Sequence, residues 1–106
     1  MALLGHDAFV QAASQNVAYA VAGGASAAST AFGAQTRWIR VCAVGVVGAT
    51  NDGVRIVVGD ATPTASATSV LLPLNWVEYV ACNPGQKVAC LSNNNTTGSL
   101  SVTELT

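Results

Sequence analysis

Apolar residues alternate with other residues along several short segments of this chain, which is the pattern of β-strands. The pattern is densest between Thr36 and Asp60, where β-branched and aromatic side chains are concentrated. An Asn-Asp-Gly sequence at 51–53 predicts a turn in the middle of this stretch. We therefore expect two strands here, on either side of that turn, at the centre of a small all-β domain.

The first of these two strands has no polar face. Every second residue from 38 onward shares one face, and the residues between them share the other. The two sets are Trp38, Arg40, Cys42 and Val44, and Arg37, Ile39, Val41 and Ala43. A strand that is apolar on both faces is typically packed on both. A second sheet or a partner subunit could supply that packing, and the sequence does not say which face is the core.

The segment 9–32 allows two interpretations. Its alanines favour helix by propensity, whereas the large residues of Asn16–Val21 stand at alternate positions and Gly23-Gly24 would stop a helix. We prefer a hairpin whose second strand, near 25–30, has very small side chains.

The second half of the chain reads as strands separated by turn signals. A strand at 67–72 ends at Pro73, and the segment 75–92 predicts a hairpin around the type II turn sequence Asn83-Pro84-Gly85-Gln86. A last strand covers 99–105, with Leu100 and Val102 facing inward. We expect an antiparallel β-sandwich, jelly-roll-like, of seven or eight strands over 9–106, preceded by a loose N-terminal arm at 1–8.

Charged residues make up only 8 % of the chain, compared with about 25 % in an ordinary soluble domain. Because the cores of protein interfaces are depleted in charge, this favours a surface that another subunit covers. A net charge of −1 argues against a nucleic-acid partner, which needs a basic patch. The segment 8–36 is free of charge but too rich in Ser, Gln and Gly for a membrane span, and the residues before it do not resemble a signal peptide, so we expect no membrane association.

No group of residues predicts a reaction, a cofactor or a metal. The three cysteines, Cys42, Cys82 and Cys90, lie in apolar segments and are expected to be buried free thiols, with a Cys82–Cys90 disulfide as an alternative. His6 is the only histidine and stands in the expected arm. The carboxylates are scattered, and nothing resembles a nucleophile elbow. We expect no enzyme.

Four aromatic residues on expected strands allow a different function. Tryptophan and tyrosine rings that share a surface could stack on sugar rings in a lectin-like module. Aromatic residues on strands are more often core or interface anchors. The four residues are Tyr19, Trp38, Trp76 and Tyr79.

Four stretches of the chain carry a family resemblance. They are Thr36–Val41 (TRWIRV), Pro73–Tyr79 (PLNWVEY), Asn83–Ala89 (NPGQKVA) and Leu100–Leu105 (LSVTEL). In size, composition and strand order from about Asn16 onward, the chain resembles the small ancillary virion proteins of tailed bacteriophages, in particular capsid decoration or cement proteins. The resemblance implies a homodimer or homotrimer that binds the outside of a major capsid protein shell, inside a virion assembled in the host cytoplasm.

The residues most suited to such contacts are tryptophan and arginine, which are enriched among interface anchors. We expect Arg37, Trp38, Arg40 and Trp76 to contribute to the interface. Two alternatives stay open. One is another virion component, such as a neck, tail or fibre-associated module, and the other is the sugar-binding module.

Overall fold

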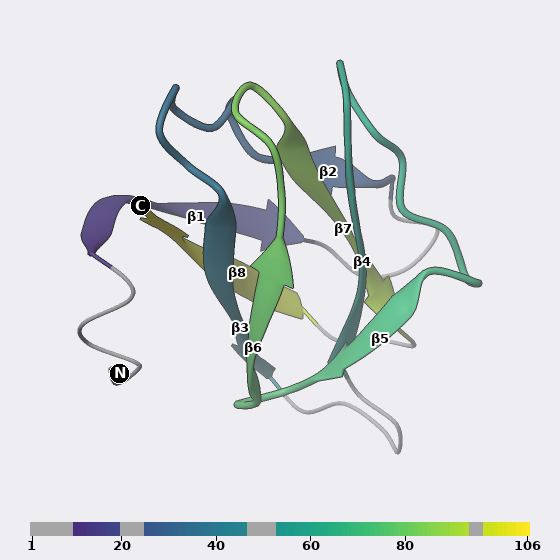
Figure 1. The fold of residues 1–106 in the computed structure, drawn as a ribbon. Helices are drawn as coiled ribbons and strands as arrows, with labels where there is room; N and C mark the ends of the chain where they lie inside the picture. Colours follow the sequence, from purple (N-terminus) through teal and green to yellow (C-terminus); the bar gives the residue numbers. More distant parts are fainter. Residues whose placement is uncertain (1–9, 20–24, 47–52, 94–96) are drawn as a thin grey trace.

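The computed structural model describes residues 10–19, 25–46, 53–93 and 97–106. These residues form eight strands in two antiparallel sheets, which confirms the expected all-β sandwich (Figure 1). The strands are β1 (Gln11–Tyr19), β2 (Ala27–Ala28), β3 (Trp38–Val46), β4 (Gly53–Gly59), β5 (Val70–Pro73), β6 (Val77–Ala81), β7 (Lys87–Asn93) and β8 (Thr97–Leu105). Sheet A has the order β1-β8-β3-β6, and sheet B has the order β2-β7-β4-β5.

The strand order follows one rule. The first strand pairs with the last, the second with the seventh, the third with the sixth and the fourth with the fifth, all antiparallel. The chain therefore runs as one long hairpin folded at the β4–β5 connection. Two further pairings, β3 with β8 and β4 with β7, join the arms of this hairpin side by side and complete the two sheets.

The expected local hairpins are wrong. β6 and β7 flank the turn at 83–86 but belong to different sheets, as do β1 and β2, and as do β3 and β4 on either side of 51–53. The turn at 83–86 itself is present, with the Gln86 N–H donating to the Asn83 carbonyl at 3.2 Å and a positive φ of 83° at Gly85. A turn reverses the chain, but it does not decide whether the next strand joins the same sheet or crosses to the facing one, about 10 Å away. The expected N-terminal arm at 1–8 and the turns expected at 23–24 and 51–52 fall on residues outside the described part of the chain.

The core lies between the two sheets. On β3 the inner face is that of Ile39, Val41 and Ala43, all completely buried, so the opposite face, with Trp38, is the outer one. The inward positions expected for Leu100 and Val102 are confirmed. Each fully buried Val, Ile or Leu side chain contributes about 1.5–3 kcal/mol through removal of apolar surface from water. The largest buried side chains are Ile39, Leu72, Leu100, Val41, Val54, Val88 and Val102.

A buried carboxylate fixes the loop that leads into β3. The Oε1 atom of Glu104 accepts hydrogen bonds from the Gly33 N–H at 2.9 Å and from the Thr36 hydroxyl at 2.5 Å. Glu104 and Thr36 are both buried. Buried polar groups of this kind need partners, and here the bonds tie the loop to the end of β8, which sets where β3 begins.

Candidate interaction surface

The outer faces of the two sheets differ. The long connection from β4 to β5 folds over the outer face of sheet B, and Ala65 within it is buried. Three contacts hold this connection in place: Arg55 donates to the Ser69 carbonyl at 3.1 Å, the Ala65 N–H donates to the Ser26 hydroxyl at 2.9 Å, and Lys87 lies 3.4 Å from the Thr62 hydroxyl. This connection thus covers part of the outer face of sheet B, although Leu71 on that face is exposed.

The outer face of sheet A has no comparable cover among the described residues. Its apolar part lies on β3 and β6, which pair with Arg40 opposite Tyr79 and Cys42 opposite Val77. Trp38 is 40 % exposed, Tyr79 51 % and Val44 53 %. We call this surface the β3–β6 face, and it consists of Trp38, Arg40, Cys42, Val44, Val77, Tyr79 and Ala81.

The four expected interface residues do not all meet on this face. Trp38 and Arg40 lie on it, next to each other in the alternation of β3. Arg37 is exposed just before β3 begins. Trp76 is also exposed, but it precedes β6 at the end farthest from Trp38, and its indole N–H donates to the Glu78 carboxylate at 3.2 Å. The structure therefore brings together two of the four and places the other two beyond the ends of the paired strands.

The residues expected at the interface did not include Val44, Val77 and Tyr79, although the alternation of the first strand had already put Val44 on one face with Trp38 and Arg40. The alternation in 75–82 already put Val77 and Tyr79 on one face of their strand. What the sequence could not supply is that this strand pairs with β3, since β3 and β6 are separated by two strands of the other sheet. The expected hairpin between β6 and β7 pointed to the wrong neighbour.

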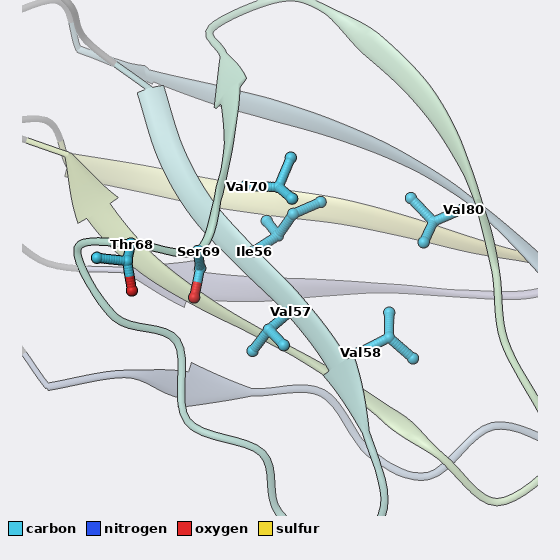
Figure 2. A pocket seen from close by; sticks show the side chains of 7 residues that line it. All are labelled: Ile56, Val57, Val58, Thr68, Ser69, Val70 and Val80. Carbon is cyan, nitrogen blue, oxygen red and sulfur yellow. The ribbon is translucent and has the colours of Figure 1, made fainter.

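An apolar groove opens on the side where β5 and β6 are the outermost strands (Figure 2). It has a volume of about 300 Å³ and is lined by Ile56, Val57, Val58, Thr68, Ser69, Val70 and Val80. β5 pairs only with Gly53–Ile56 of β4, so the following residues of β4 lack a strand neighbour on that side and leave this space. Val70 at its rim is 70 % exposed.

Burial governs the titratable groups of the interior. It raises the pKa of the Cys90 thiol to about 11, and burial, with a smaller contribution from the Glu104 carboxylate, raises the pKa of the Cys82 thiol. Burial is also the main cause that raises the pKa of Tyr19 to about 12, and its hydroxyl donates to the Val44 carbonyl at 3.1 Å. All three cysteines are free thiols, with Cys82 and Cys90 buried and Cys42 half-buried on the β3–β6 face. Since the thiolate is the reactive form, Cys82 and Cys90 are held in their unreactive form near neutral pH.

The arrangement of the aromatic residues argues against the sugar-binding alternative. Tyr19 is buried in the core, Trp38 and Tyr79 lie on the β3–β6 face, and Trp76 stands beyond the far end of β6. The four rings do not form one platform. Within the described ranges, no three His, Cys, Asp or Glu side chains gather as metal ligands would. The same ranges hold no helix with the length and apolar character needed to span a membrane.

Comparisons with known proteins add no relative: no family model, no curated protein and no solved structure matches this chain.

Proposed function

We propose that this chain is a structural subunit of a bacteriophage virion that binds and stabilises the outer surface of the capsid shell. The observation that carries the proposal is the asymmetry of the sandwich. The β4–β5 connection covers part of the outer face of sheet B, whereas the β3–β6 face of sheet A presents Trp38, Val44 and Tyr79 to solvent. Contiguous exposed apolar surface of this kind marks a site of protein association.

The composition of the face supports contact with protein. Arg40 is its single charged residue, and tyrosine, tryptophan and arginine are the residue types enriched in interfaces. A decoration protein acts through contact area. It needs a broad, rigid surface, which a β-sheet provides, and it needs no catalytic group.

The strand order supports the class of fold. Eight strands that run as one folded hairpin, with the order β1-β8-β3-β6 facing β2-β7-β4-β5, are what a jelly roll would have, and we propose that the sandwich is one. Jelly rolls occur in viral capsid proteins and in lectins. The fold alone therefore leaves the sugar-binding alternative open, and the dispersed aromatic rings disfavour it.

The proposal is tested by counting the chain in purified particles. Particles are isolated from cells infected with a phage whose genome encodes this chain, and quantitative mass spectrometry gives its copies relative to the major capsid protein. Capsid decoration predicts hundreds of copies per particle. A few tens or fewer would favour the neck, tail or fibre alternative, and a chain present in the lysate but absent from the particles would refute a virion function.

A further inference from the structure

We propose that the β3–β6 face binds a carboxylate of the shell protein at Arg40, in a contact that is otherwise apolar. This contact rests on the proposed function, which supplies the shell as the partner, and it specifies the chemical group that the shell presents. The partner surface is then an aspartate or glutamate side chain surrounded by apolar residues.

Arg40 is the one charged residue on the outer face of sheet A, as far as the structure describes that face. Its cross-strand neighbours, Thr103 on β8 and Tyr79 on β6, are both uncharged. Arg40 is half-buried, so its guanidinium lies in uncharged surroundings. On the same face, β1 and β8 add only small, hydroxyl and amide side chains, namely Ser14, Asn16, Ala18, Ser99, Ser101 and Thr103.

The three carboxylate side chains within the described ranges are all engaged elsewhere. Asp60 accepts a hydrogen bond from a glutamine side chain, Glu78 accepts one from an indole N–H, and Glu104 is buried and accepts from the loop at 33–36. None of the three lies on the outer face of sheet A. The described part of the chain therefore does not neutralise the charge of Arg40.

A carboxylate is the group that complements this face. When a partner protein covers the face, the guanidinium loses water, and a desolvated charge needs a group of opposite charge. A carboxylate matches the planar guanidinium through two parallel hydrogen bonds. The exposed side chains of Trp38, Val44 and Tyr79 on the same face would keep water away from such a pair.

A second copy of this face cannot supply the carboxylate. Among the described residues the face has no acidic side chain, and two copies set against each other would bring two Arg40 guanidinium groups into one interface. Like charges in a contact are unfavourable. The complementary group therefore belongs to a different protein.

Co-sedimentation with shells that lack this chain compares three variants with the wild type. Arg40→Met removes the charge and should bind at least about tenfold more weakly, because the shell carboxylate is left buried without a partner. Arg37→Met makes the same change at an exposed position just before β3, and it should bind within about twofold of the wild type because exposed charges contribute little. Arg40→Lys keeps the charge without the planar fork and should lie between these two.

Carbodiimide cross-linking of the complex tests for the carboxylate itself. The reagent joins an amine to an adjacent carboxylate as an amide, so the amine introduced by Arg40→Lys should become linked to an Asp or Glu side chain of the shell protein. Peptide mass spectrometry identifies the linked residue. Lys87, the only native lysine, begins β7 in the other sheet and is the internal control, for which no link to the shell is expected.

The outcomes distinguish this contact from the proposed function. A wild type that binds no shells would refute the proposed function, and the contact with it. Three results would overturn the contact while leaving shell binding intact: equal binding of Arg40→Met and the wild type, equal loss in the two methionine variants, or cross-linking to the shell through Lys87 and not through position 40.

Discussion

At the scale of single residues, the buried polar groups of this sandwich hold loops in place. Glu104 shows the effect most clearly, because it brings a carboxylate from β8 beneath the loop at 33–36 and receives two hydrogen bonds there. Ser29 acts similarly: its hydroxyl accepts from the Val88 N–H at 3.0 Å, while its own N–H donates to the Val88 carbonyl. The sequence did not predict this role for Glu104, because no residue near it in the chain indicates a contact with a loop about 70 residues earlier.

Removing the Glu104 carboxylate should therefore destabilise the fold. Glu104→Ala leaves the Gly33 N–H and the Thr36 hydroxyl without an acceptor, and we expect a loss of about 2 kcal/mol in the free energy of unfolding. Thr36→Ser keeps the hydroxyl and loses one methyl group, so its cost should stay below about 1 kcal/mol. Urea unfolding followed by tryptophan fluorescence measures both. A smaller loss in Glu104→Ala than in Thr36→Ser would contradict the role assigned to the carboxylate.

The raised pKa of Cys90 predicts a loss of stability in alkaline solution. The thiol titrates near 9 in the unfolded chain and at about 11 in the fold. Below pH 9 both states are protonated and the stability is at its full value. As the pH rises from about 9 to about 11, the unfolded state ionises first and gains stability, so the free energy of unfolding falls.

The urea midpoint measured between pH 8 and 10.5 tests this titration. Cys90→Ala lacks the thiol, so its midpoint should decline less steeply than that of the wild type over the same interval. The comparison between slopes removes the cost of the cavity that the alanine creates, because that cost does not depend on pH. Equal slopes in the two proteins would show that Cys90 does not titrate as assigned.

At the scale of elements, close backbone approach between β3 and β8 sets a strict requirement for glycine. Gly45 lies opposite Gly98, and a Cβ on Gly98 would meet the Val44 carbonyl oxygen and the Gly45 Cα well inside contact distance. The Tyr19 hydroxyl, which donates to the same carbonyl, crowds Gly45 as well. Neither strand can accept a side chain here without moving its partner.

Gly98→Ala should therefore separate the β3–β8 ladder, with a cost of about 3 kcal/mol or failure to fold, in the range for a steric clash in a packed interior. Gly85→Ala is the matched control. It has open space around its Cβ position and a φ of 83°, so only the backbone conformation is strained, at about 1 kcal/mol. Thermal unfolding by circular dichroism compares the two. A Gly98→Ala variant as stable as Gly85→Ala would contradict the close approach.

The sequence predicted the positions of most strands but not their pairing partners. Alternation located β3, β4, β6, β7 and β8, and it put Ile39, Val41, Leu100 and Val102 on the correct faces. Turn chemistry identified the type II turn at 83–86. Pairing partners escaped prediction because a strand's own pattern says which face is buried but not which strand lies beside it. The β3–β6 face depends on such a long-range pair, and for that reason the sequence predicted the residues of β3 on this face but not those that β6 adds.

At the scale of the whole molecule, the outer faces of the two sheets differ. The β4–β5 connection covers part of sheet B, whereas the β3–β6 face of sheet A has no comparable cover among the described residues. Many copies of such a face can bind a repetitive shell.

The shell contact itself is tested most directly by co-sedimentation. Capsids are prepared from a phage in which the gene for this chain is deleted, and the purified chain is added over a range of concentrations. The test variant, with Trp38→Ser and Val44→Ser, loses two exposed apolar side chains of the β3–β6 face and leaves β6 unchanged. The control, Val10→Ser, loses an exposed apolar side chain outside that face. We expect saturable binding of the wild type and of Val10→Ser, and binding at least tenfold weaker for the Trp38→Ser, Val44→Ser variant. Equal binding of all three proteins, or no binding of the wild type, would contradict it.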